Sequence, residues 1–403
     1  MFWTEENCLQ SVRLTRANSS VRNSKSERLE SKLMNSLEST PLNSQSVTMR
    51  LTYPNQNGMF ARIADTIGKH GGDLGQVDLL GSAAKLLTRG VNVRARSQDH
   101  VDEIVTAVRD LDKVEVVEVS DPVFRMHQGG KITVHSKIPL ASRETLSMAY
   151  TPGVARVSAA IAQDRRQVWA LTIKGNSVAV VSDGTAVLGL GDIGPEAALP
   201  VMEGKAMLFK EFGAIDAYPI CLRTKEPNEI VETVSNLSVG FAGVNLEDIS
   251  APRCFEVEQK LQQRLEIPVF HDDQHGTAIV VLAGILNVLR LGGQRLDELK
   301  IVISGAGAAG MAIAKILLKS GARDLIVCDR QGILNLKRSA KLHPSKRWLA
   351  RHTNPRHLCG RLGDALRGAN VFIGVSAPGL LTAKSVKRMA PKPIVFALAN
   401  PVP

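Results

Sequence analysis

The stretch from Lys300 to Asp329 has the pattern of a strand, a glycine-rich loop, a helix and a second strand. Residues 300–304 are apolar enough for a buried strand, and residues 311–320 have helical spacing. The second strand ends at Asp329, at the distance where an acidic side chain meets the ribose hydroxyls of a dinucleotide. We therefore predict a nucleotide-binding βαβ unit that contacts its ligand through Asp329 and the Gly-x-Gly-x-x-Gly loop: Gly305, Ala306, Gly307, Ala308, Ala309 and Gly310.

The composition indicates a chain of several domains. With 403 residues, 44% hydrophobic and 22% charged, the chain can bury large cores, and about two to four domains are expected. The formal net charge of +11 suggests nucleic acid, but the basic residues are scattered and the few aromatic residues do not alternate with them. We interpret the excess as a solvated surface that suits an anionic substrate, and we expect no nucleic-acid partner.

Compartment and targeting signals favour a cytoplasmic protein. The five cysteines are widely spaced and form no CxxC pair, which fits a reducing compartment. No run approaches the roughly 18 to 20 apolar residues of a membrane span, and no secretory signal is apparent. Residues 1–46 are rich in Ser, Asn, Arg and Glu and are expected to be disordered. A transit peptide is the alternative, but Glu5 and Glu6 argue against it.

A domain is expected at residues 47–127, in which residues 47–120 switch period in the order strand, helix, strand, strand, helix, strand. That βαββαβ order predicts a ferredoxin-like sandwich. With the loops at residues 55–58 and 71–74 around the first helix, the segment resembles an ACT domain. The resemblance implies a regulatory domain for a small effector, often an amino acid. A structural or dimerising role without a ligand is the alternative.

The rest of the chain is divided by composition into two further α/β domains. Residues 121–130 contain Asp-Pro and Gly-Gly pairs and are interpreted as a linker. A catalytic domain is expected at residues 128–268, with strands at 177–182 and 217–222. A Rossmann-like doubly wound domain is expected at residues 269–403, with a helix at 364–368 and strands at 371–376 and 394–398.

Two acidic pairs precede the glycine loop and predict a metal site. Glu247 and Asp248 form the first pair, and Asp272 and Asp273 the second. Hard dications such as Mg2+ and Mn2+ prefer oxygen ligands, and three carboxylates would leave positions open for a chelating substrate. Taken alone, the first pair could be a surface turn and the second a helix N-cap.

Zinc is the alternative metal. His271 and His275 have the i, i+4 spacing of zinc ligands. Neither cysteine neighbours nor an HExxH glutamate accompany them, so zinc is not favoured.

Two further side chains suit proton transfer. Small and apolar neighbours flank Lys205, so desolvation would lower its pKa toward that of a general base. Tyr150 precedes Thr-Pro-Gly, a rigid turn that could aim its hydroxyl. A solvated lysine and a packed core tyrosine are the alternatives.

Six motifs in order over residues 130–403 resemble the malic enzyme family. They are Ser147-Met-Ala-Tyr-Thr-Pro-Gly-Val-Ala155, Asp183-Gly-Thr-Ala-Val-Leu-Gly-Leu-Gly-Asp192, Met202-Glu-Gly-Lys-Ala206, Asn245-Leu-Glu-Asp248, His271-Asp-Asp-Gln-His-Gly-Thr277 and Phe396-Ala-Leu-Ala-Asn-Pro401. By resemblance, Tyr150 is the proton donor and Lys205 the general base. The implied metal ligands are Glu247, Asp248 and Asp273, and Asn400 would reach both substrate and nicotinamide.

The resemblance implies oxidation of malate followed by decarboxylation to pyruvate and CO2 at one metal site. Asp329 favours NAD, although Arg330 could meet the 2′-phosphate of NADP. We expect NAD, Mg2+ or Mn2+ and a homo-oligomer. Family members continue beyond the Asn-Pro motif, so a fragment or a truncated gene model is expected at Pro403.

Two other functions are alternatives. A metabolite-sensing or assembly protein built on a degenerate enzyme would carry substitutions at the chemical positions, and none of those positions is substituted here. An amino-acid dehydrogenase would share the glycine loop and a lysine base, but it has no need of three carboxylates. Metal dependence separates these functions.

Overall fold

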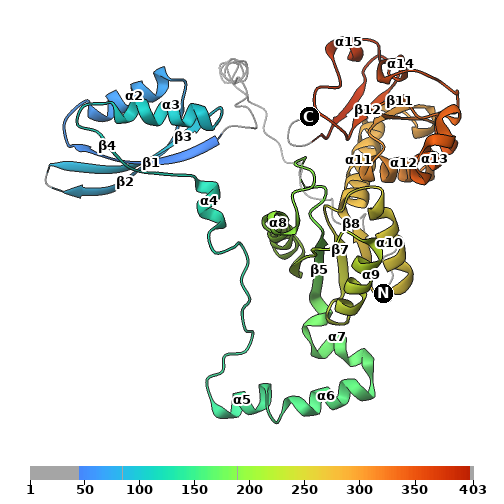
Figure 1. Cartoon of the computed structure of the whole chain (residues 1–403), viewed down its shortest axis with the longest axis horizontal. Coiled ribbons are helices and arrows are strands. Elements are labelled where there is room, and N and C mark those ends of the chain that lie inside the picture. Colours follow the sequence, from blue (N-terminus) through green and yellow to red (C-terminus); the bar gives the residue numbers. More distant parts are fainter. Residues whose placement is uncertain (1–44, 84, 188, 400–403) are drawn as a thin grey trace, which may run out of the picture. The chain divides into compact units, whose positions relative to one another are not determined.

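The computed structural model describes residues 45–399 except 84 and 188 (Figure 1). These described residues form two compact units, which divide between Arg125 and Met126. The predictions made for residues 1–44 and for Asn400 lie outside the described residues.

The first unit has the predicted βαββαβ order. Its four-stranded sheet has the strand order β2-β3-β1-β4, and α2 and α3 cover one face of the sheet (Figure 1). Alternate residues of β1 are buried beneath the helices because side chains of a strand point to opposite faces. The elements are β1 (Gln45–Pro54), α2 (Met59–Lys69), β2 (Asp73–Ala83), β3 (Leu86–Ala95), α3 (Gln98–Arg109) and β4 (Glu115–Ser120).

A short helix, α4 (Pro122–His127), occupies most of the segment that was predicted to be a linker. The carboxylate of Asp121 accepts a hydrogen bond from the backbone N–H of Val123 at 2.7 Å, as an N-cap side chain does. Proline is tolerated in the first turn, where its missing N–H has no helical partner. The Asp-Pro pair therefore starts a helix within the predicted linker, and the division between the two compact units falls in the same segment, after Arg125.

The second unit begins with an arm of short helices. These are α5 (Arg143–Ala149), α6 (Val154–Gln163), η2 (Arg165–Gln167), α7 (Val168–Leu171) and η3 (Ile173–Asn176). No residue of α5, α6 or α7 is buried. Figure 1 shows α5 and α6 extending away from the sheet that follows them.

A four-stranded parallel sheet follows the arm, in the order β6-β5-β7-β8. Its strands are β5 (Ser177–Ser182), β6 (Asp216–Cys221), β7 (Gly243–Leu246) and β8 (Val269–His271), and its helices are α8 (Pro195–Gly213), α9 (Pro227–Leu237) with η4 (Ser238–Gly240), and α10 (Arg253–Arg264). Since β8 pairs with β7, residues 269–271 belong to this sheet, three residues beyond the predicted boundary.

The nucleotide-binding region contains the other sheet of the second unit. Its strand order is β11-β10-β9-β12-β13, and all strands except β11 are parallel. The glycine loop follows the central strand β9, beside the point where the order turns from β10 to β12, and dinucleotides bind at such points. The helix predicted at residues 364–368 is shorter and begins at Leu362.

The elements of this region are β9 (Lys300–Ser304), β10 (Asp324–Asp329), β11 (Gly332–Ile333), β12 (Val371–Gly374), β13 (Ile394–Ala397), α11 (Asp272–Gly292), η5 (Leu296–Glu298), α12 (Ala308–Lys319), η6 (Leu336–Lys341), α13 (Pro344–His352), α14 (Leu362–Ala365) and α15 (Ala383–Val386).

Helix α11 is long and apolar enough to cross a membrane by length and composition, and 22% of its apolar window is buried. The core helix of a soluble protein passes the same test. Ala278, Val281, Ile285 and Leu289 of α11 lie in the core that also contains β9 and α12. The helix is therefore a structural member of the nucleotide-binding region.

Candidate active site

Three carboxylates that follow the ends of two neighbouring strands, β7 and β8, meet at one edge of the β6-β5-β7-β8 sheet. Glu247 and Asp248 follow β7, and Asp273 lies in the first turn of α11, directly after β8. One oxygen of each carboxylate lies within 4.8 Å of the others. Oδ2 of Asp273 also accepts the backbone N–H of Asp248 at 3.0 Å, which locks the two loops together. Parallel strands bring their carboxyl ends to the same edge, so adjacent loops converge here.

The cluster is electrostatically unfavourable without a cation. Burial, opposed by the charge of Lys205 and reinforced by Asp273 and Asp272, raises the pKa of Glu247 to about 8. Burial, followed by the charge of Asp273, raises the pKa of Asp248 to about 7. Oδ2 of Asp248 is buried without a hydrogen-bond partner among the described residues. An all-oxygen donor set of this kind fits Mg2+ or Mn2+.

Lys205 of α8 points at the same cluster. Its Nζ lies 3.2 Å from Oε1 of Glu247 and 2.7 Å from Oδ2 of Asp272, and the side chain is 21% exposed. Burial alone would lower the lysine pKa, but the charges and hydrogen bonds of Glu247 and Asp272 together raise it. The predicted lowering of the Lys205 pKa is therefore wrong for the metal-free chain, because the sequence did not reveal the two carboxylates beside it.

Glu258 of α10, which the sequence did not single out, fixes the start of α11. Its carboxylate accepts the backbone N–H of His271 at 3.2 Å and Nε2 of Gln274 at 3.1 Å, and it lies 2.7 Å from Nε2 of His275. That contact engages Nε2 of His275. The available signal was a glutamate on the apolar stripe of α10, beside Cys254, Val257 and Leu261.

The glycine loop has the geometry of a phosphate-binding turn. Gly305 has φ +131°, and a Cβ there would lie 2.7 Å from the carbonyl oxygen of Val375. A Cβ on Gly310 would lie 1.9 Å from the carbonyl oxygen of Gly305, so glycine is required at both positions. Gly307 has open space, and α12 begins next to it with its first N–H groups available to an anion.

Asp329 ends β10 as predicted, but its carboxylate is already engaged by cations. It lies 2.9 Å from Nη2 of Arg338 and 3.3 Å from Nζ of Lys346. Burial would raise the pKa of Asp329, and the hydrogen bonds and charges around it, chiefly those of Arg338, bring it below its usual value. The sequence did not reveal these two partners.

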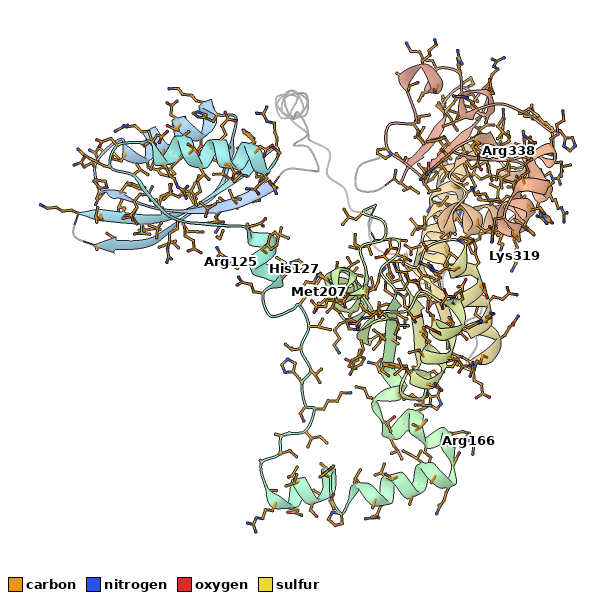
Figure 2. All side chains as sticks on the ribbon, in the orientation of Figure 1. Arg125, His127, Arg166, Met207, Lys319 and Arg338 are labelled. Atoms are coloured by element: carbon orange, nitrogen blue, oxygen red, sulfur yellow. The ribbon has the colours of Figure 1, made fainter. Side chains whose placement is uncertain are left out.

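Tyr150 is the predicted site residue that the chain does not bring to the cluster. It caps the end of α5 and is 68% exposed. The arm joins the sheet through η3 at the amino end of β5, whereas the carboxylates follow the carboxyl ends of the parallel strands β7 and β8. Figure 2 shows the side chains of the arm, including Arg166, standing clear of the sheet.

Comparison with known proteins identifies the family. Residues 129–262 match the malic enzyme N-terminal domain, and residues 274–403 match the malic enzyme NAD binding domain. The chain belongs to the malic enzyme family. The first matched segment contains Glu247 and Asp248, the second contains the glycine loop, and Asp273 lies between the two segments.

Three similar proteins come from bacteria. The NAD-dependent malic enzyme of Geobacillus stearothermophilus is 53% identical over 89% of this chain and 74% of its own length. The bifunctional malic/malolactic enzyme of Bacillus subtilis is 52% identical over 68% of this chain and 67% of its own. The crystal structure of the NAD-dependent malic enzyme of Thermotoga maritima superposes with a TM-score of 0.68 at 50% identity, over 70% of this chain and 76% of that one.

Proposed function

We propose that the protein oxidises malate with NAD or NADP and decarboxylates the product to pyruvate and CO2, using Mg2+ or Mn2+. The observation that carries this proposal is the convergence of Glu247, Asp248 and Asp273 on one point, with the amino group of Lys205 beside them. A chelating 2-hydroxy acid needs both a dication and a base at its C2 oxygen. The family membership points to the same reaction.

The residues of the site have separate proposed roles in binding the metal, binding the dinucleotide and transferring a proton. Glu247, Asp248 and Asp273 would hold the dication, and the loop from Gly305 to Gly310 would hold the dinucleotide pyrophosphate. When bound, these groups supply a nicotinamide that accepts hydride from C2 and a Lewis acid that stabilises the enolate as CO2 leaves. Lys205 takes the proton of the C2 hydroxyl, while Asp272 keeps its amino group aimed at the cluster. Asn400 is proposed to contact substrate and nicotinamide.

We further propose that Tyr150 protonates C3 of the enolate in the site of a second copy of the chain, within a homo-oligomer. The arm leaves exposed apolar side chains that an amphipathic helix normally buries. They are Leu146, Met148, Val154, Val157, Trp169 and Leu171. A symmetric pair of chains would cover both arms and complete both sites at once.

The first unit is proposed to be an ACT-like regulatory domain. Its support is the strand order β2-β3-β1-β4 with both helices on one face, a ferredoxin-like arrangement. A small effector would bind there and adjust the activity of the second unit. A cytoplasmic location accords with the free cysteines Cys221, Cys254, Cys328 and Cys359.

Formation of reduced nicotinamide from L-malate, together with pyruvate, tests the proposed reaction. The assay should give both products with Mn2+ and neither after chelation. Equal rates with Mn2+ and with chelator would contradict the role of the acidic cluster. An amino-acid substrate that is oxidised in place of malate would identify a different dehydrogenase.

A further inference from the structure

We propose that the end of β10 binds the 2′-phosphate of an adenine dinucleotide through Arg338 and Lys346, so that NADP binds at least as tightly as NAD. This inference rests on the proposed dinucleotide-binding function and names its specificity residues. It departs from the usual meaning of an acidic residue at this position, which is recognition of a free 2′-hydroxyl.

The acceptor atoms of Asp329 are already used within the chain. Oδ1 accepts Nη2 of Arg338 at 2.9 Å and the backbone N–H of Gln331 at 3.0 Å. Oδ2 accepts the same guanidinium nitrogen at 3.0 Å and Nζ of Lys346 at 3.3 Å. The carboxylate side chain is 8% exposed. A ribose hydroxyl would have to displace one of these donors to form a hydrogen bond to Asp329. The carboxylate is therefore poorly available as an acceptor for the ribose diol.

The two cations come from different elements and remain reachable. Arg338 lies on η6 and is labelled in Figure 2, while Lys346 lies on α13. Their side chains are 22% and 37% exposed, respectively, much more than that of Asp329. Arg338 is also held by the backbone carbonyls of Gly332 and Ile333, at 3.2 and 3.0 Å, so its guanidinium has a fixed orientation.

The charge balance at the end of β10 favours an anion. Arg330, Arg338 and Lys346 contribute three positive charges against the single negative charge of Asp329. One cation is enough to neutralise a buried carboxylate, so Lys346 is in excess for a purely structural ion pair. Lys346 makes the longer of the two contacts and can turn toward a phosphate at little cost. Arginine and lysine together are well suited to a terminal phosphate.

Calorimetric titration of the full chain with two nucleotide probes tests the inference without turnover. Adenosine 2′,5′-bisphosphate carries the extra phosphate, and 5′-AMP lacks it. We expect the bisphosphate to bind about 10-fold more tightly, the scale of one charge-assisted contact, and more salt-sensitively than 5′-AMP. In Lys346→Ala that preference should largely disappear with 5′-AMP binding unchanged, whereas Lys346→Arg should retain it.

Lys337→Ala is the matched control, because Lys337 is an exposed lysine on the same 3-10 helix as Arg338. It should keep the parent preference, and melting temperatures should show that all variants fold. Equal affinity of the parent for the two nucleotides, or an unchanged preference in Lys346→Ala, would overturn the inference while leaving dinucleotide binding in place. A parent chain that binds neither nucleotide would contradict the proposed dinucleotide function itself.

Discussion

The amino group of Lys205 lies 2.7 Å from a carboxylate oxygen of Asp272. The neighbouring aspartate, Asp273, points instead to the backbone of Asp248 and joins the acidic cluster. Two consecutive aspartates at the start of α11 thus face two different partners, one the proposed base and the other the proposed metal site. This division of roles makes the pair experimentally separable.

Replacement of Lys205 by alanine should abolish malate oxidation without unfolding the chain. Removal of a general base typically lowers the rate by about 10² to 10⁴. The glycine loop is untouched, so NAD binding measured by calorimetry should be unchanged. Lys210→Ala is the control, because Lys210 lies on the same helix with an exposed ion pair to Asp216. A Lys205→Ala chain with near-parental turnover would remove the lysine from the mechanism.

The metal-ligand assignment predicts different responses of the two aspartates to Mn2+. A dication that binds only the folded chain raises the melting temperature by mass action. Asp273→Asn should lose most of that increase together with activity, whereas Asp272→Asn should keep more of it, because Asp272 contacts Lys205 rather than the cluster. Melting curves against Mn2+ concentration would measure both. If Asp273→Asn gains the full parental increase, Asp273 is not a ligand.

The raised carboxylate pKa values predict a pH dependence. Glu247 and Asp248 have pKa values of about 8 and about 7, against ordinary values of 4.5 and 3.8. The folded chain therefore holds these protons more tightly than the unfolded chain. Stability without metal should fall as pH rises from about 4 to about 8, once other groups are accounted for with a reference chain that carries Glu247→Gln and Asp248→Asn.

Mn2+ requires the deprotonated carboxylates, so its effect should change in the opposite direction. The increase in melting temperature at fixed Mn2+ should be larger at about pH 8 than at about pH 6. An increase that is the same at both values would show that Glu247 and Asp248 are already ionised in the metal-free chain.

The sequence predicted strands and acidic motifs well because their signals are local. The pattern from Lys300 to Asp329 gave β9, the glycine loop, α12 and β10 with small errors at the ends. The sequence could not reveal contacts between elements that are distant along the chain. Lys205 meets Glu247 and Asp272, and Asp329 meets Arg338 and Lys346, only after the chain folds. The pKa shifts and the cofactor preference depend on such contacts. The expected direction of the Lys205 pKa shift was therefore wrong.

The arm provides the last prediction, because Tyr150 and Lys205 would act together only across two chains. Tyr150→Phe removes only a hydroxyl and should reduce pyruvate formation while leaving the Mn2+ increase in melting temperature intact. Lys205→Ala is inactive for a different reason. If each site takes its tyrosine from the other chain, a mixed dimer of these two variants contains one complete site.

We would unfold, mix and refold the two inactive variants in equal amounts and assay malate-dependent pyruvate formation. Random pairing into dimers gives half mixed dimers with one complete site each, so activity should recover to about a quarter of the parental value. The control is a mixture of Tyr150→Phe with the doubly substituted chain, which has no complete site in any pairing and should stay inactive. A mixture of the single variants that stays equally inactive, although gel filtration shows mixed oligomers, would mean that Tyr150 serves its own chain or does not take part.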